Sequence, residues 1–169
     1  RQRQMCIRDS TVTLKHKIAD ESYYVKKHLE ESGISREILK NRSILFAEDN
    51  DLNAEIAAVI LERAGLKVER VEDGLQCISR ITEMPAGTYD IILMDIQMPK
   101  MDGYKATQTI RNLSDQEKAC IPIIAMTANA FEEDKRAAIA AGMNGHIAKP
   151  IQVDKLLSIL AEMIRQQEN

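Results

Sequence analysis

Five polar residues follow or end short apolar runs of the chain, and their chemical types together suit phosphoryl chemistry. The set contains three carboxylates, a hydroxyl and an ammonium, namely Glu48, Asp49, Asp95, Thr127 and Lys149. Carboxylates packed in an apolar crevice remain ionised only if a cation neutralises them. A set of oxygen ligands without His or Cys favours Mg²⁺ or Mn²⁺ over zinc. We therefore expect a magnesium site whose lysine and threonine could bind phosphoryl oxygens.

The reaction class that this set implies is phosphoryl transfer with an aspartate as the nucleophile. Asp95 is the favoured nucleophile because it ends the central expected strand. Glu48 and Asp49 are adjacent at the end of the neighbouring strand and are favoured as metal ligands. The alternative is that acidic residues at strand ends only cap the next helix. Capping is the preferred interpretation for Asp51 or Asp73 alone, but it does not explain a lysine directly before a proline at the fifth strand end.

Short apolar runs alternate with helical repeats from residue 43 onward, as in an α/β domain. The expected strands are Ser43–Ala47, Leu66–Val71, Tyr89–Asp95, Ile121–Met126 and Gly145–Lys149. The expected helices cover about 52–64, 74–81, 104–113, 131–141 and 153–164. Five strands alternating with five helices predict a doubly wound α/β domain with an all-parallel sheet. Because parallel strands end at one edge, we expect the five polar residues to converge there.

Composition and charge exclude several classes of protein. The 169 residues are 44% hydrophobic and 29% charged, which is ordinary for a globular chain. No apolar run approaches the ~18 residues of a membrane span, so no membrane contact is expected. Three scattered cysteines without C-x-x-C spacing indicate neither a disulfide framework nor a thiolate zinc site, and a cytoplasmic location is expected. Residues 44–169 carry thirteen Lys and Arg against twenty Asp and Glu, so no nucleic-acid-binding surface is expected.

Four motifs, in order along the chain, resemble the receiver (response-regulator) domain of two-component signalling. They are I-L-F-A-E-D-N at 44–50, D-I-I-L-M-D-I-Q-M-P at 90–99 with M-D-G at 101–103, P-I-I-A-M-T-A at 122–128, and G-M-N-G-H-I-A-K-P at 142–150. The resemblance covers residues 43–167, about three quarters of the chain. It implies a flavodoxin-like sheet of order 2-1-3-4-5 and a function in phosphorelay signal transduction.

Carried over position by position, the resemblance implies that Asp95 is the phosphoacceptor. Asp49, Asp95 and the backbone carbonyl of Gln97 would ligate Mg²⁺, with Glu48 acting largely through water. The phosphoryl group would come from a kinase phosphohistidine and would pass to a phosphotransfer-domain histidine, or would switch a protein interface. The implied partners are therefore a histidine kinase, a histidine phosphotransfer domain or both, and a weak homodimer stays open.

The resemblance also implies a switch at the last two strands. Thr127 would hydrogen-bond a phosphoryl oxygen, and Lys149 would ion-pair with the phosphoryl group beside a cis bond to Pro150. Three residues before the lysine the family usually has Tyr or Phe, whose ring turns inward when the threonine moves; this chain has His146. Two interpretations stay open: a smaller ring that makes the same movement, or an imidazole whose protonation near neutral pH biases the switch.

Residues 1–42 differ from the rest and are expected to be an N-terminal extension or linker before a receiver domain at 43–169. Residues 11–14 and 17–20 resemble the last strand and exit of a histidine-kinase ATP-binding domain, although a chance alternating stretch is the alternative. Residues 19–31 have weak helical character, and residues 35–39 could form one helical turn. The chain thus resembles the end of a hybrid sensor kinase, whose full-length parent would be a cytoplasmic or membrane-anchored histidine kinase.

Two other classes of function fit less well. A Mg²⁺ phosphohydrolase that forms an aspartyl phosphate usually needs a second acid/base aspartate two residues after the nucleophile, where this chain has Gln97. A flavodoxin-like nucleotide or flavin carrier needs a phosphate loop rich in Gly, Ser or Thr after the first strand, where this chain has four residues of the pattern E-D-N-D. A receiver would catalyse its own phosphorylation without turning over a small-molecule substrate, so its status as an enzyme stays open.

Overall fold

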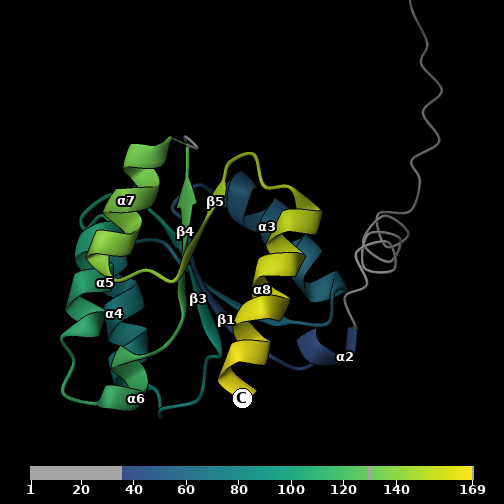
Figure 1. Cartoon of the computed structure of the whole chain (residues 1–169), viewed down its shortest axis with the longest axis horizontal. Coiled ribbons are helices and arrows are strands. Elements are labelled where there is room, and N and C mark those ends of the chain that lie inside the picture. Colours follow the sequence, from purple (N-terminus) through teal and green to yellow (C-terminus); the bar gives the residue numbers. More distant parts are fainter. Residues whose placement is uncertain (1–35, 129–130, 169) are drawn as a thin grey trace, which may run out of the picture.

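The computed structural model describes residues 36–128 and 131–168, and it shows a five-stranded parallel sheet between two layers of helices (Figure 1). The strands are β1 (Ser43–Ala47), β2 (Lys67–Val71), β3 (Ile91–Asp95), β4 (Ile123–Thr127) and β5 (Gly145–Ala148). Their order is β2-β1-β3-β4-β5, which confirms the doubly wound, flavodoxin-like prediction. The strand and helix suggested at 11–14 and 19–31 lie outside the described residues.

The described residues form seven helices, whereas the sequence predicts five. They are α2 (Arg36–Leu39), α3 (Asp51–Arg63), α4 (Gly74–Glu83), α5 (Gly103–Arg111), α6 (Gln116–Ala119), α7 (Glu132–Ala141) and α8 (Val153–Glu168). The helical turn suggested at 35–39 is present as α2, whereas α6 is additional; each has four residues, too few to show a helical repeat. At the end of α6, the Arg111 guanidinium donates to the carbonyl oxygens of Ala119 at 2.6 Å and Ile121 at 2.8 Å. A side chain from the end of α5 therefore binds the backbone at the end of this helix.

Two hydrophobic layers flank the sheet because successive strand side chains point to opposite faces. Ile44 and Phe46 of β1 pack in the layer of α2, α3 and α8, whereas Leu45 and Ala47 pack in the layer of α4, α5 and α7 (Figure 1). All five residues of β3 and of β4 are buried, as expected for strands that are covered on both faces. None of the helices within 36–128 and 131–168 combines the length and apolar character needed to cross a membrane.

The core extends to residues before 43. Leu39 of α2 is fully buried in the layer of α3 and α8. The Asn41 N–H donates to the Gly65 carbonyl at 2.9 Å, and the Arg42 guanidinium pairs with Asp90 at 3.1 Å. The end of the segment expected to be a linker is thus packed onto the sheet domain.

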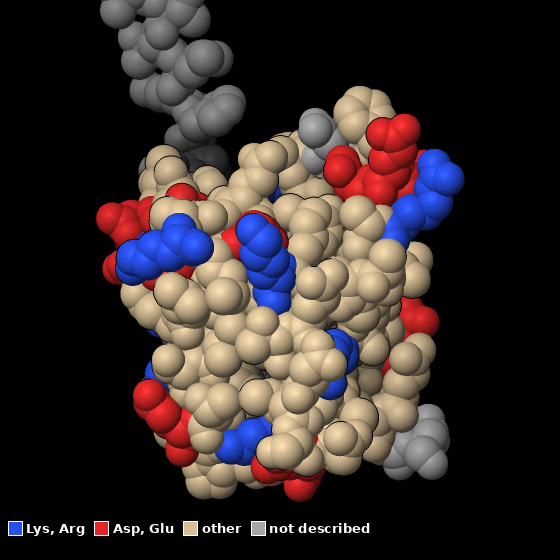
Figure 2. Space-filling model, turned by 90° about the vertical axis from the view of Figure 1, so that its left-hand side faces the viewer, with Lys and Arg blue, Asp and Glu red and all other residues tan. Residues whose placement is uncertain are grey.

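Charged side chains lie in small groups on the face formed by α4, α5 and α7, separated by uncharged surface (Figure 2). Acidic and basic groups often adjoin one another, as in the pair of Lys105 with Asp102 at 3.1 Å. Among the described residues, this face shows no continuous basic patch.

The carboxyl ends of all five strands lie at one edge of the sheet. The parallel register places Ala47 of β1 beside Met94 of β3, and Asp95 of β3 beside Met126 of β4. The connection after β1 runs through α3 on one face, whereas the connection after β3 runs through α5 on the other face. The edge between β1 and β3 is therefore the switch point where doubly wound folds bind ligands.

Candidate functional site

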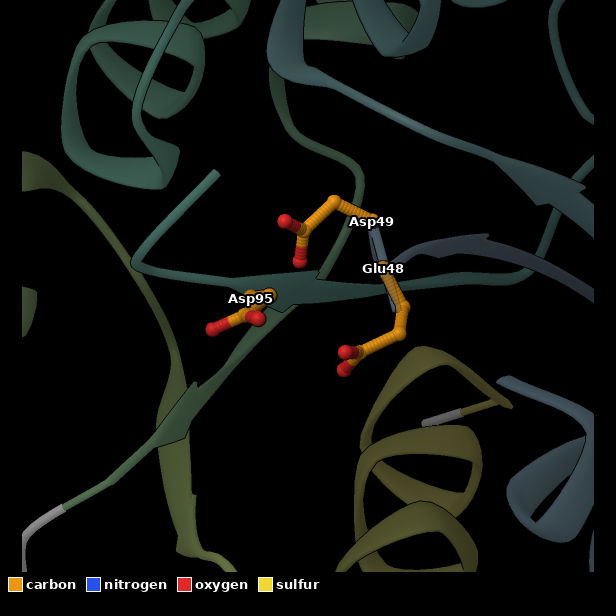
Figure 3. Close-up of side chains that lie close together, drawn as sticks. All are labelled: Glu48, Asp49 and Asp95. Carbon is orange, nitrogen blue, oxygen red and sulfur yellow. The ribbon is translucent and has the colours of Figure 1, made fainter. Parts of the chain in front are cut away.

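Three carboxylates meet at this edge (Figure 3). One oxygen each of Glu48, Asp49 and Asp95 lies within 4.8 Å of the other two. Glu48 and Asp95 are buried, whereas Asp49 is exposed. Glu48 and Asp49 directly follow β1, and Asp95 is the last residue of β3. The convergence of carboxylates expected from the sequence is thus observed, and two neighbouring strands produce it.

The Lys149 ammonium joins two of these carboxylates. Its Nζ donates to Glu48 Oε2 and to Asp95 Oδ2, each at 2.6 Å. Burial lowers the pKa of Lys149, but the two carboxylates raise it more, so the net pKa lies above the ordinary value and the amine is charged at neutral pH. Burial raises the pKa of Asp95, and the opposing effect of Lys149 does not cancel the rise. One ammonium therefore does not balance the negative charge of three carboxylates.

The remaining expected residues surround this cluster. The Gln97 N–H donates to Asp95 Oδ1 at 3.2 Å, which holds residue 97 beside the carboxylate. Thr127 is the buried last residue of β4, and its carbonyl accepts the Lys149 N–H at 2.7 Å. The bond between Lys149 and Pro150 is cis, which confirms that expectation. The ends of β1, β3, β4 and β5 thus bring the five expected polar residues to one edge of the sheet.

A cleft of about 430 Å³ leads to the cluster. It is lined by Glu48, Asn53, Ile56, Ala128, Lys149, Pro150 and Ile151. Ile56 of α3 is 54% exposed, and Leu52, one helical turn earlier, is 65% exposed. Because they are four residues apart on α3, these two exposed apolar side chains lie on one face of the helix beside the cleft.

His146 lies in β5, opposite Ala125 of β4, and is half-buried. Burial is the largest influence on its pKa and lowers it; Lys135 of α7 lowers it further, and Glu132 opposes both. The net pKa is below the ordinary value, so the imidazole is neutral at pH 7. This direction argues against protonation near neutral pH, and the interpretation of a smaller ring that makes the same movement stays a prediction.

Two side chains that the sequence reasoning missed contact the acidic loop between β1 and α3. Asn53 Nδ2 donates to Glu48 Oε1 at 3.1 Å. Arg70 of β2 donates to the backbone carbonyls of Glu48 at 3.0 Å and Asp49 at 3.2 Å. The sequence offered one signal for Arg70: it is an arginine near the end of the strand K-V-E-R-V. A guanidinium at that position needs hydrogen-bond acceptors, which the end of a neighbouring strand can supply.

The start of α5 packs directly against the backbone that carries Asp95. The Gly103 N–H donates to the Ile96 carbonyl at 3.0 Å. A Cβ at position 103 would overlap the carbonyl oxygen of Asp95 and would lie 2.9 Å from Met94 Cγ. A glycine is therefore required here for close approach of the helix to the end of β3.

The fold and the site together define a doubly wound α/β domain. A cluster of carboxylates, two of them bonded to a lysine, lies at the carboxyl ends of its strands. Residues 44–161 match the model of the response regulator receiver domain. The chain belongs to this family.

The curated relatives include histidine kinases. The signal transduction histidine-protein kinase BarA of Escherichia coli K12 is 37% identical over 118 residues, which are 70% of this chain and 12% of BarA. The chain spans about a tenth of the length of the curated relatives that it matches. The relationship is thus to the receiver part of much longer proteins.

Solved structures of receiver domains are also similar. The receiver domain of the sensor histidine kinase PA1611 from Pseudomonas aeruginosa PAO1, which has a magnesium ion coordinated in its active site cleft, is 38% identical with a TM-score of 0.67, covering 74% of this chain and 98% of that one. A co-crystal structure of the Saccharomyces cerevisiae histidine phosphotransfer protein Ypd1 with the receiver domain of Ssk1 matches with a TM-score of 0.69 and 26% identity, covering 76% of this chain and 92% of that one.

The donor set of the site fits a hard divalent cation. All donors in the cluster are carboxylate oxygens, and the exposed position of Asp49 leaves room for water ligands. Magnesium prefers oxygen ligands and keeps several of its waters. The excess of negative charge around Lys149 supplies the electrostatic attraction.

We predict that Gly103→Ala distorts the site. The new methyl group must displace the Asp95 backbone or α5, which costs about 1–3 kcal/mol of unfolding free energy. Urea unfolding and the amide NMR shift of Asp95 measure the two effects. Gly145→Ala in β5 is the control, because its methyl group would lie 3.9 Å from the nearest side chains. Equal behaviour of the two variants would contradict the prediction.

We also predict a pH-dependent contribution of His146 to stability. Its folded-state pKa is lowered, so the unfolded chain binds the proton first as pH falls through about 6.5, and stability declines in that range. Relative to wild type, His146→Phe should therefore gain stability as pH falls from 7.5 to 5.5. Thermal unfolding at each pH measures this difference, and Lys135→Gln should raise the imidazole pKa in an NMR titration. A His146 pKa at or above the ordinary value would refute the idea.

Proposed function

We propose that this domain accepts a phosphoryl group on Asp95 from a phosphohistidine and acts in a phosphorelay. The observation that carries the proposal is the arrangement around Asp95. Its carboxylate is buried at the end of β3, within 4.8 Å of carboxylate oxygens of Glu48 and Asp49, and Lys149 lies 2.6 Å from its Oδ2. A nucleophilic carboxylate between a cation site and an ammonium is suited to an anionic phosphoryl group.

The cation that suits this arrangement is Mg²⁺. Asp49, Asp95 and the backbone carbonyl of Gln97 would hold it, and Glu48 would act largely through water. When bound, the ion supplies positive charge that neutralises the carboxylates and attracts phosphoryl oxygens. Support comes from the oxygen-only cluster and from the magnesium ion in the PA1611 receiver domain.

The side chains of this chain perform the remaining steps. A carboxylate oxygen of Asp95 attacks phosphorus, and the O–P bond forms as the N–P bond of the phosphohistidine breaks. The electron pair of that bond stays on the histidine nitrogen, which takes up a proton from solvent water to give neutral imidazole. Lys149 transfers its hydrogen bond from Asp95 to a phosphoryl oxygen, while its bond to Glu48, which is 2.6 Å in the unphosphorylated domain, is kept. Thr127 donates its hydroxyl hydrogen to a second phosphoryl oxygen.

The donor in this proposal is a histidine kinase, a histidine phosphotransfer domain or both. A phosphohistidine must enter the cleft from its open side, so the protein that carries it covers the exposed Leu52 and Ile56. The complex of Ypd1 with the Ssk1 receiver domain supports a phosphotransfer protein as such a partner. The phosphoryl group then passes to another histidine or changes a protein interface, with a weak homodimer as one form of that interface.

The interface change would begin at Thr127 and His146. His146 lies opposite Ala125, two residues before Thr127 on the adjacent strand, so both side chains belong to the β4–β5 pair. Movement of the threonine toward the phosphoryl group would open space for the imidazole. The neutral state of the ring at pH 7 supports an inward movement, since a charged ring would resist burial.

In the parent protein, residues 43–169 would form the receiver domain, and residues 1–42 would link it to a preceding kinase domain. The burial of Leu39 supports a linker whose end is packed on the receiver.

We predict that Asp95→Asn abolishes phosphorylation. Incubation with phosphoramidate and Mg²⁺, followed by intact mass spectrometry, should show the added phosphoryl group on wild type and not on the variant. Asp102→Asn is the matched control, because asparagine also caps a helix and Asp102 serves as the N-cap of α5. Full phosphorylation of Asp95→Asn, or its loss in Asp102→Asn alone, would refute the assignment. Removal of Mg²⁺ with EDTA should abolish the reaction of wild type.

We further predict that Ile56→Ser slows phosphotransfer from a phosphorylated histidine phosphotransfer protein by about tenfold, which corresponds to about 1.4 kcal/mol. The reaction with phosphoramidate should not change, because a small donor does not touch α3. Ile139→Ser on α7 is the control, since Ile139 is also exposed (70%) but does not line the cleft. Equal slowing by both variants, or by both donors, would argue against a partner surface at Ile56.

A further inference from the structure

The guanidinium of Arg70 contacts the acidic loop at two points and the first residue of α3 at a third. Its Nε donates to the Glu48 carbonyl at 3.0 Å, and its Nη2 donates to the Asp49 carbonyl at 3.2 Å. Its Nη1 pairs with Asp51 Oδ1 at 2.7 Å. All three nitrogens thus bind the four residues 48–51, which run from the end of β1 to the first residue of α3, and two of the nitrogens bind backbone carbonyls.

These contacts mark the place where the chain leaves the sheet. The Glu48 N–H still donates to the Val71 carbonyl at 3.0 Å, so the ladder between β1 and β2 extends to residue 48. In a continuing strand, consecutive carbonyls and consecutive side chains would point in opposite directions. Here the carbonyls of Glu48 and Asp49 both reach one guanidinium, and the two side chains both approach Asp95.

The two residues whose carboxylates approach Asp95, Glu48 and Asp49, are therefore the same two whose carbonyls bind Arg70. Figure 3 shows the Glu48 and Asp49 side chains around Asp95 at the ends of two strands. The ion pair with Asp51 contributes little by itself, because the Asp51 side chain is 90% exposed. The two bonds to the backbone carbonyls are the contacts that bear on the site.

We propose that Arg70 is a positioning residue for the cation site. By holding the carbonyls of Glu48 and Asp49 on one side of the loop, it keeps both carboxylates turned toward Asp95 before the ion arrives. This inference rests on the proposed function, since it concerns the magnesium site assigned there.

The positive charge of Arg70 and its hydrogen bonds to the loop are expected to change the affinity for Mg²⁺ in opposite directions. This difference makes the proposal testable. As a positive charge near the cluster, Arg70 would repel Mg²⁺, and its removal would tighten binding. As a positioning residue it organises the ligands, and its removal would weaken binding, typically by about 10–100-fold for residues that orient metal ligands. The sign of the change in affinity therefore distinguishes the two roles.

The decisive experiment compares Mg²⁺ binding by the full chain in wild type, Arg70→Met and Arg80→Met. The chain has no Trp, so binding is followed by calorimetry and by the amide NMR shifts of Asp49 and Asp95. Arg80→Met is the matched control, because Arg80 also bonds a carboxylate, Glu69 Oε1 at 2.6 Å, but does not contact the acidic loop. Thermal unfolding without metal is measured for each protein.

We expect Arg70→Met to raise the dissociation constant of Mg²⁺ about tenfold or more, and Arg80→Met to leave it unchanged even if both variants lose similar stability. Unchanged or tighter binding in Arg70→Met overturns the positioning role. Absence of Mg²⁺ binding by wild type overturns the proposed function itself, so the two failures are distinguishable.

Arg70→Lys provides the second variant if Arg70→Met does not fold. Lysine keeps the charge but cannot bind two carbonyls and a carboxylate with a planar fork. A weakened Mg²⁺ affinity in Arg70→Lys supports the positioning role, whereas an affinity equal to that of wild type overturns it.

Discussion

Electrostatic repulsion among three carboxylates at the end of a parallel sheet is the constraint on which the rest of this structure depends. Two unit charges 4 Å apart interact by about 4 kcal/mol at an effective dielectric constant of about 20. Carboxylate oxygens of Glu48, Asp49 and Asp95 lie within 4.8 Å of one another, and Lys149 is the ammonium bonded to two of them. Such an excess of negative charge is tolerated where a cation can offset it, and the oxygen-only donor set suits such a cation.

The fold maintains this arrangement with backbone contacts close to the charged side chains. Gly103 allows α5 to approach the end of β3, where any larger residue would overlap the Asp95 carbonyl. Arg70 binds two successive carbonyls of the acidic loop, and Asn53 bonds the Glu48 oxygen that Lys149 does not use. The scaffold thus orients the carboxylates through Gly103 and Arg70, which do not line the cleft, and through Asn53, which does.

The two hydrophobic layers serve different parts of the proposed cycle. The layer of α3 and α8 adjoins the cleft, where Ile56 and Ile151 join its lining. The opposite layer includes α7, whose Lys135 and Glu132 set the electrostatic surroundings of His146. A phosphorylated partner would meet the first layer, whereas a change at Thr127 and His146 would reach the second. In this proposal the central strands would separate the surface of α3 that a partner covers from the β4–β5 pair and α7, which would respond to phosphorylation.

The sequence alone determined the parallel sheet and the convergence of the carboxylates. Apolar runs such as I-I-L-M at 91–94 are typical of strands that helices cover on both faces, and this run ends at Asp95. The family motifs likewise predicted the cis bond after Lys149. The tertiary structure decided what depends on approach between distant segments. Arg111 binds the carbonyl of Ala119 at the end of the short helix α6, and the burial of Leu39 against α3 and α8 extends the core before residue 43. Arg70 lies about twenty residues from the loop that it binds, and only the pairing of β2 with β1 brings its guanidinium there. Periodicity reports which face of an element is apolar, but it carries no information on the partner that a single polar side chain meets in space.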